Sequence, residues 1–353
     1  MDNDLPLNKI YLGDSLKYMR GLPDESVDLV VSSPPYNLGK EYETKISLDQ
    51  YLQNQREFLQ ECARLLKQTG SIFWQVGAYS NKGALYPLDI YFFPILIELG
   101  LVPINRIIWV RPHGLHARNK YSCRHETVLW FAKSNNYKFE VEKIRVPQKY
   151  QNKRSWKGDS KGKLSSNPKG KNPGDIWMFQ NVKHNHEEQT IHPCQFPEDF
   201  LSRIVLSTTD ESDVVLDPFM GAGSLAVVAR DHKRNFLGAE IDEKYFSIAN
   251  RRLLGEPDEN NSFPNLKTLR NYIERTGKKI ENFKFDTQTA KKPTEKKKSR
   301  TFSESHHLES HLKRLEFEEL TFSSRLRGEK PPMDYLCHNR KIMDERNQKN
   351  FFE

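Results

Sequence analysis

The stretch Val27-Asp28-Leu29-Val30-Val31-Ser32-Ser33-Pro34-Pro35-Tyr36-Asn37 determines the fold that this sequence predicts. Its short, continuous apolar run favours a strand that is buried on both faces of a sheet. The two prolines then prevent both continuation of the strand and an immediate helix. The result is a stiff turn just past a strand end, where open α/β sheets bind their ligands. The Ser33 and Pro34 carbonyls, outside regular pairing and beside the Tyr36 ring, suit a planar ligand that carries an amino group. We call residues 33–37 the proline turn.

Strands and helices are expected to alternate along the rest of the chain. The hydrophobic patterns predict strands over residues 10–12, 71–76, 106–110, 126–131, 214–216 and 236–238. They predict helices over residues 16–22, 48–68, 91–99, 200–206, 225–231 and 245–254, and Gly70 is expected to end the second helix. This alternation indicates an α/β fold with a mostly parallel, doubly wound sheet that has helices on both faces.

The composition favours a soluble chain with a polyanionic partner. The 353 residues suffice for one large domain and something smaller, and 29% of them are charged. The net charge of +8 favours a partner such as nucleic acid, although a need for solubility also explains a basic chain. The four cysteines are scattered without CxxC spacing, which argues against a zinc site or a disulfide framework and indicates reduced thiols.

No targeting or membrane-spanning segment is expected. The first residues, Met1 to Asp4, provide neither the basic region nor the apolar region of a signal peptide. The longest apolar run, Tyr91 to Val102, is interrupted by Pro94, Glu98 and Gly100 and is too short to span a bilayer. The sequence therefore predicts a cytoplasmic protein that does not contact a membrane.

A basic segment interrupts the alternation between residues 134 and 187, and we call it the basic insert. It has little apolar periodicity, and from Lys143 to Lys171 it holds ten Lys or Arg residues against one acid, Asp159. Because Trp156 lies among these cations, the insert could neutralise phosphates and also offer a ring contact. A solvated linker is the alternative interpretation. The candidate phosphate-contacting residues are Lys149, Lys153, Arg154, Lys157, Lys161 and Lys163.

A second strand end leads into the sequence Asp217-Pro218-Phe219-Met220-Gly221-Ala222-Gly223-Ser224, which we call the glycine turn. Gly221 and Gly223 let the backbone approach a ligand where a Cβ would collide, and Asp217 can accept a hydrogen bond from an amine. Glu240 ends the next strand 23 residues later. This is near the offset of about 20 residues at which an acid binds ribose hydroxyls. The Pro-Phe pair departs from the Gly-x-Gly-x-x-Gly pattern of dinucleotide sites.

Both turns resemble motifs of DNA methyltransferases that modify the exocyclic amino nitrogens of cytosine or adenine. Residues 33–36 resemble the (Ser/Asp/Asn)-Pro-Pro-(Tyr/Phe/Trp) catalytic motif. Residues 217–224 resemble the Asp-Pro-Phe-x-Gly-x-Gly-(Ser/Thr) motif that binds S-adenosylmethionine. Residues 192–197 look like the His-Pro-x-x-x-Pro element of the same family, and Asp14 matches its Gly-Asp. The catalytic motif comes first, the basic insert second and the cofactor motif last, which is the permuted order of the group usually called beta.

The resemblance implies a methyltransferase fold that uses S-adenosylmethionine and no metal. The catalytic residues that it implies are Ser33, Pro34, Pro35 and Tyr36. The cofactor-binding residues that it implies are Asp14, Phe196, Asp217, Phe219, Gly221, Gly223 and Glu240. The expected organisation is a catalytic half over residues 1–133, the basic insert as the target-recognition region over 134–187, a cofactor-binding half over 188–255, and a polar C-terminal extension over 256–353 that is partly linker or disordered.

The reaction that the resemblance implies is methyl transfer to the amino nitrogen of a base flipped out of double-stranded DNA and stacked on Tyr36. In the family, serine at the first motif position is associated more with cytosine N4, so we favour that base and keep adenine N6 as the alternative. The restriction-modification type also implies a cognate restriction endonuclease that acts on the same site. A monomer and a homodimer both stay open.

Other interpretations compete with this one. An RNA methyltransferase would suit a basic chain, although no Lys/Arg-Gly-Phe-Gly-Phe motif is visible. A non-catalytic DNA-binding subunit is a second alternative, although both motifs look intact. Pro193-Cys194-Gln195 matches the nucleophile of carbon-5 cytosine methyltransferases, but Cys194 precedes the cofactor motif, which favours a packing role. In the C-terminal extension, residues 304–320 could form one amphipathic helix that contacts DNA or a second subunit.

Overall fold

The computed structural model describes residues 5–39, 44–81, 83–111, 116–148, 153–183, 186–278 and 283–286. All of these residues belong to the compact unit that spans residues 1–289. Lys149 and the helix expected over residues 304–320 lie outside the described residues. None of the helices within the described ranges is both long enough and apolar enough to cross a bilayer.

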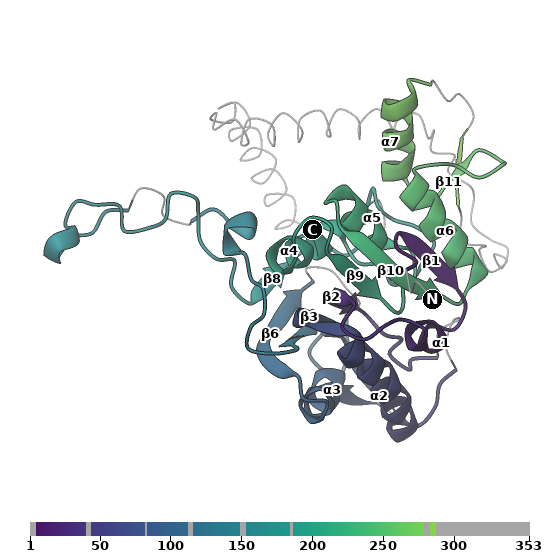
Figure 1. The fold of residues 1–353 in the computed structure, drawn as a ribbon, viewed down its shortest axis with the longest axis horizontal. Coiled ribbons are helices and arrows are strands. Elements are labelled where there is room, and N and C mark those ends of the chain that lie inside the picture. Colours follow the sequence, from purple (N-terminus) through teal and green to yellow (C-terminus); the bar gives the residue numbers. More distant parts are fainter. Residues whose placement is uncertain are drawn as a thin grey trace. The chain divides into compact units, whose positions relative to one another are not determined.

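An eight-stranded sheet forms the centre of this unit (Figure 1). Its strands are β1 (Lys9–Leu12), β2 (Val27–Ser32), β3 (Leu66–Val76), β6 (Val102–Val110), β7 (His125–Ala132), β8 (Ile176–Met178), β9 (Val214–Asp217) and β10 (Asn235–Glu240). Their order is β1-β10-β9-β2-β3-β7-β6-β8. The first five strands in this order are parallel, whereas β7 is antiparallel to both of its neighbours. The predicted α/β fold with a mostly parallel sheet is therefore confirmed.

Helices cover both faces of the sheet, because the central strand β2 is apolar on both sides. The helices are α1 (Ser15–Arg20), α2 (Leu48–Leu65), α3 (Leu88–Glu98), α4 (Glu198–Thr208), α5 (Ser224–Asp231) and α6 (Glu243–Leu254). Val30 packs in a core cluster with α1, α2 and α3, whereas Val31 packs in a second cluster with α4, α5 and α6. This arrangement confirms the doubly wound architecture.

The prediction that Gly70 ends a helix is wrong. Helix α2 ends at Leu65 and β3 begins at the next residue, so Gly70 lies within the strand. A Cβ at Gly70 would lie 3.0 Å from the carbonyl oxygens of Asp28 and Lys67. The register between β2 and β3 shifts at this point. Glycine is therefore needed for the close approach of two strands at an irregularity in their pairing.

Regular structure that the sequence analysis missed follows α6. It consists of β11 (Ser262–Phe263), α7 (Leu266–Thr276) and β12 (Lys284–Phe285). The Asn265 side chain accepts a hydrogen bond from Thr268 N–H at 2.8 Å and donates to the Glu188 carbonyl at 2.9 Å. These bonds cap α7 and attach it to the segment before α4. A short hairpin, β4 (Ala78–Asn81) with β5 (Ala84–Pro87), and two 3₁₀ turns, Val141–Ile144 and Gly158–Ser160, complete the described elements.

Candidate active site

Four neighbouring strands bring the predicted site residues to one edge of the sheet. Ser33 follows β2, Asp217 ends β9, Glu240 ends β10, and Asp14 lies just past β1. Because these strands are parallel and adjacent, their carboxyl ends meet at the same edge. Ser32 Oγ, at the end of β2, donates to Asp217 Oδ1 at 2.5 Å, although the two residues are 185 positions apart in the chain. The proline turn and the glycine turn are therefore direct neighbours.

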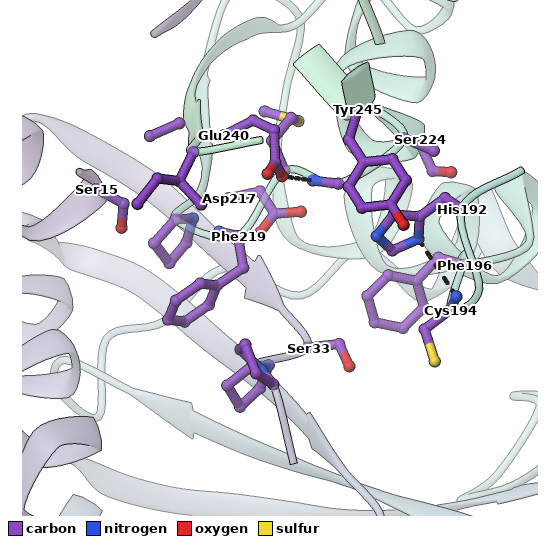
Figure 2. A pocket seen from close by; sticks show the side chains of 18 of the residues that line it. Ser15, Ser33, His192, Cys194, Phe196, Asp217, Phe219, Ser224, Glu240 and Tyr245 are labelled. Atoms are coloured by element: carbon purple, nitrogen blue, oxygen red, sulfur yellow. Dashed lines mark hydrogen bonds between the residues drawn. The ribbon is translucent and has the colours of Figure 1, made fainter. Parts of the chain in front are cut away.

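These strand ends line a cleft with about 1080 Å³ of empty space, its open mouth included. In Figure 2, Ser33 and Glu240 lie toward different ends of this cleft, with Asp217 between them, and the rings of Phe219 and Phe196 lie on either side of it. All of the predicted catalytic and cofactor-binding residues except Gly223 line the cleft. Residues that also line it but lie outside the predicted motifs include Ser15, Phe58 and Tyr245.

The two glycines of the glycine turn have different roles. Gly221 has a φ of +53°, a conformation that glycine adopts readily, and its N–H donates to Glu240 Oε2 at 2.7 Å. Gly223 has a φ of +74°, and a Cβ there would lie 2.8 Å from the Ala249 Cβ on α6. Gly221 therefore presents backbone to the cleft, whereas Gly223 lets α6 pack beneath the turn.

The Asp217 carboxyl is buried, and burial raises its pKa from 3.8 to about 7. Hydrogen bonds from Ser32 and from the Phe219 N–H favour the ionised form, and the charge of Glu240 opposes it. Burial also raises the pKa of Glu240. No cationic side chain in the described part of the chain pairs with Asp217. A ligand that brings an ammonium group into the cleft would supply the missing positive charge.

Hydrogen bonds on both flanks hold the proline turn in place. The Tyr51 hydroxyl on α2 donates to the Pro35 carbonyl at 2.7 Å. The Asn37 side chain donates to the Ile46 carbonyl and accepts from the Ile46 N–H, both at 2.8 Å. Asn37 itself has a φ of +58°, so the chain reverses sharply there. The acceptors of the turn are thus fixed by the fold.

Tyr36 is held by its hydroxyl and by its ring. The hydroxyl donates to Gln75 Oε1 at 2.7 Å and lies 3.1 Å from Ser33 Oγ. The ring packs against the backbone of Gly77, where a Cβ would lie 2.9 Å from it. Burial and the charge of Glu126 raise the pKa of Tyr36, so its hydroxyl stays protonated. Gln75 and Glu126 are partners that the sequence analysis did not identify.

Among the basic residues predicted to contact phosphates, those that the structure describes do not line the cleft. Isolated bridges join Arg154 to Leu164 and Ser155 to Lys161, and the Trp156 side chain is 84% exposed. Exposed cations around an exposed ring suit a phosphate backbone, and this role stays a prediction. The five candidates that the structure describes are all exposed: Lys153, Arg154, Lys157, Lys161 and Lys163.

A mostly parallel sheet in which a proline turn and an acidic glycine turn meet at adjacent strand ends is typical of the class of α/β methyltransferases. The family model for DNA methylases, which covers N6 and N4 methyltransferases, matches residues 27–251. The chain belongs to this family of DNA methylases.

Comparison with individual proteins agrees with this membership. The chain is 55% identical to the Type II methyltransferase M.BglII of Bacillus subtilis over 313 residues, which are 88% of this chain and 87% of the relative. It is 35% identical to the Type II methyltransferase M.ScaI of Streptomyces caespitosus over 257 residues, which are 70% of this chain and 81% of the relative. The solved structure of the PvuII DNA methyltransferase (cytosine-N4-specific) shares the fold, with a TM-score of 0.55 and 23% identity over 69% of this chain and 84% of that one.

The chain is therefore a DNA amino-methyltransferase of the restriction-modification type that uses S-adenosylmethionine, as the sequence predicts. The alternatives of an RNA methyltransferase and a non-catalytic subunit are set aside. The residues of the cleft fit this cofactor. Gly221 and Glu240 line the cleft, the Gly221 N–H orients the Glu240 carboxylate, and Asp217 is a buried carboxyl without a cationic partner in the described ranges.

Proposed function

We propose that this enzyme methylates the N4 amino group of cytosine within one recognised sequence of double-stranded DNA. The residue that favours cytosine is Ser33, because serine at this position of the resembled motif is associated more with cytosine than with adenine. The observation that carries the proposed reaction is the hydrogen bond between Ser32 and Asp217. It joins the turn proposed to accept the base to the turn proposed to hold the methyl donor.

The task of the proline turn is to make an amino nitrogen nucleophilic. The lone pair of an exocyclic amine is conjugated into the ring, and acceptors at its two N–H groups favour a pyramidal nitrogen with a free lone pair. Ser33, through its side chain or carbonyl, and the Pro34 carbonyl are the acceptors that we propose. S-adenosylmethionine, when bound, supplies an electrophilic methyl group on a sulfonium. Positioning and electrostatics at the turn then provide most of the rate.

Each residue proposed to bind the cofactor is assigned to one part of it. Asp217 is proposed to accept from the ammonium group and Glu240 from the ribose hydroxyls, while Phe196 and Phe219 supply apolar walls. Both Glu240 oxygens already accept backbone N–H bonds, from Gly221 at 2.7 Å and from Asp242 at 2.9 Å. The carboxylate is therefore oriented before a ligand arrives, and it keeps lone pairs for the ribose.

Tyr36 is proposed to contact the flipped base, since the target nitrogen is unreachable inside a duplex. We expect Tyr36→Ala to weaken DNA binding by about 1 to 3 kcal/mol and to slow methyl transfer. Cofactor affinity, measured by calorimetry, should stay nearly unchanged. Tyr36→Phe keeps the ring and removes only the hydrogen bonds to Gln75 and Ser33, so it isolates the contribution of the hydroxyl. An equal loss of base methylation and cofactor affinity in Tyr36→Ala would contradict this role.

The chemical identity of the product tests the proposed base. The chain is expressed in a bacterial host without its own DNA methylation, and hydrolysed DNA is analysed by mass spectrometry and by nanopore sequencing. We expect N4-methylcytosine at one sequence only. Detection of N6-methyladenine instead would identify adenine, the alternative base, as the target. 5-Methylcytosine would assign the chemistry to Cys194, whereas under our proposal Cys194→Ala keeps its methylation activity.

We also propose that the basic insert contacts the DNA and that a cognate restriction endonuclease acts on the same sequence. The exposed cations of the insert support the first proposal. The second is tested once the methylated sequence is mapped, because DNA from the expressing host should then resist an endonuclease specific for that sequence. Sedimentation of the purified enzyme with and without DNA distinguishes a monomer from a homodimer.

A further inference from the structure

A second cavity lies beside the proline turn and contains about 510 Å³ of empty space, its mouth included. It shares Ser33, Tyr36 and residues 194–196 with the cofactor cleft. Its other walls come from β3, β6 and β7 and from residues 181–183. Because β7 is antiparallel, its first residues lie at the same sheet edge as the last residues of β3 and β6. A base that reaches the proline turn can therefore extend from the cofactor cleft into this second cavity.

A chain of hydrogen bonds connects the wall of the second cavity to Ser33. Arg111 Nη1 pairs with Glu126 Oε1 at 2.9 Å, and Gln75 Nε2 donates to Glu126 Oε2 at 2.5 Å. Gln75 Oε1 accepts from the Tyr36 hydroxyl, which lies 3.1 Å from Ser33 Oγ. Because a carboxylate only accepts hydrogen bonds, Glu126 fixes the direction of the Gln75 amide. This wall of the cavity is therefore rigid, and its donors point in defined directions.

Two polar atoms of this wall have no hydrogen-bond partner among the described residues. They are Arg111 Nε and Asn181 Oδ1, and both are buried. A buried polar group without a partner is costly, so such groups in an enzyme cavity indicate that a polar ligand completes the pairing. Trp109, Val182 and Phe196 line the same cavity. The cavity thus combines apolar contact for a planar ring with a polar wall in which Arg111 holds an unpaired donor.

We propose that the flipped cytosine occupies this cavity and that Arg111 donates a hydrogen bond to its O2 carbonyl, which selects cytosine over adenine. This inference rests on the proposed function. When its N4 group is held at the proline turn, cytosine presents two acceptors, N3 and O2, to the opposite wall. Adenine held by its N6 group presents C2–H where cytosine has O2, and it leaves the Arg111 donor unpaired. Asn181, whose amide can turn to present its NH2 group, is the donor that we assign to N3.

The test removes O2 from the substrate and the donor from the enzyme, separately and together. The substrate is a duplex with the mapped site, in which a 2-aminopyridine C-nucleoside replaces the target. This base keeps the amino group and the N3 of cytosine but lacks O2. Arg111→Lys keeps a positive charge beside Glu126 but lacks the Nε–H donor. We expect wild-type kcat/KM to fall roughly 10- to 100-fold on the analogue. The variant should distinguish the two duplexes by less than about threefold.

A matched control and a second variant keep the test decisive. Arg106→Lys changes an arginine within β6 that pairs with Asp89 at 2.6 Å and does not line the cavity. This variant should keep the full loss on the analogue. Arg111→Gln/Glu126→Gln removes the whole ion pair and is measured in the same cycle if Arg111→Lys does not fold. Calorimetric titration with S-adenosylmethionine verifies that each variant retains its cofactor site.

The two possible failures are distinguishable. If Arg111→Lys loses as much activity on the analogue as the wild type does, the enzyme and substrate changes act independently and the assignment of Arg111 to O2 is overturned. The proposed function itself fails in a different experiment, in which the wild-type enzyme transfers no methyl group to N4 of the unmodified duplex. Wild-type methylation of adenine in place of cytosine would overturn both.

Discussion

At the scale of single residues, Asp217 places a buried carboxyl in the candidate site at a cost in stability. Its carboxyl is buried at the end of β9 and hydrogen-bonded to Ser32, and its pKa is raised to about 7. A folded-state pKa above the unfolded value of 3.8 means that ionisation of this group costs stability. The free energy of unfolding therefore falls as the pH rises from about 4 to about 7. Cofactor-free enzyme carries this cost at neutral pH.

We expect Asp217→Asn to stabilise the cofactor-free enzyme at pH 8, by an amount on the order of 1 to 4 kcal/mol. The asparagine keeps an oxygen that can accept from Ser32 and from the Phe219 N–H, but it carries no charge. The stability difference should disappear near pH 4, where the wild-type carboxyl is also neutral in the folded state. Urea unfolding at both pH values measures it, and calorimetry should show weaker cofactor binding. A variant that is less stable than the wild type at pH 8 would contradict the electrostatic interpretation.

A second prediction concerns Gly77, which lies against the Tyr36 ring. Gly77→Ala places a Cβ 2.9 Å from that ring, so Tyr36 has to move away from Gln75 and Ser33. We expect a loss of about 1 to 3 kcal/mol in stability and slower methyl transfer, with little change in cofactor affinity. Gly21→Ala is the control, because that Cβ comes no closer than 3.4 Å to its nearest neighbour. Unchanged methylation kinetics in Gly77→Ala would show that Tyr36 is not held in place by this contact.

At the scale of elements, α6 supports the glycine turn through one buried arginine. Arg252 Nη1 donates to the Ala222 carbonyl at 2.5 Å and to Ser224 Oγ at 3.1 Å. Its Nη2 pairs with Glu198 on α4 at 2.6 Å, and the two side chains are only 1% and 6% exposed. The position of the turn therefore depends on an ion pair between α4 and α6.

We predict that Arg252→Met destabilises the enzyme by about 3 to 5 kcal/mol, because it leaves the buried Glu198 with Lys267 as its one described partner. It should also weaken cofactor binding, since the Ala222 carbonyl loses its donor. Arg20→Met is the control, because the Arg20 and Glu57 side chains are 58% and 46% exposed and such pairs contribute less than about 1 kcal/mol. Chemical denaturation and calorimetry measure both effects. A neutral Arg252→Met would mean that packing alone holds the turn.

An element or residue could be predicted when a local sequence pattern marks it, and it could not be predicted when only tertiary contacts do. The proline and glycine turns carry local signatures at strand ends, so their residues were predicted. Gln75, Arg111 and Glu126 meet only because β3, β6 and β7 are neighbours in the sheet, and no local pattern reports that adjacency. Helix α7 was missed although Leu266, Leu269, Tyr272 and Ile273 recur at helical spacing, because the polar composition after Gly255 was interpreted as an extension without regular structure. The start of β3 was missed because apolar spacing continues from the helix into the strand.

At the scale of the whole molecule, the proposed role of the basic insert predicts that DNA binding can be weakened without a change in the cleft. We expect Lys153→Gln/Lys157→Gln/Lys161→Gln to weaken DNA binding and to reduce the slope of log K against log salt by about 0.9 for each phosphate that the variant no longer neutralises. Cofactor affinity should be unchanged, because none of these side chains lines the cleft. Lys9→Gln/Lys233→Gln is the control, since Lys9 begins the edge strand β1, Lys233 lies two residues before β10, and neither belongs to the basic insert. An unaltered salt slope in the triple variant would assign the insert to a linker.

The pairing of β2 with β9 has a consequence for the ancestry of such enzymes. The proposed donor site and the proposed acceptor site are joined across a hydrogen-bonded pair of strands, and not along the polypeptide. A gene rearrangement that exchanged the order of the two coding segments would leave the same strands side by side and the same reaction geometry intact. The order of the two motifs along the chain can therefore change during evolution, as long as these two strands stay paired in the sheet.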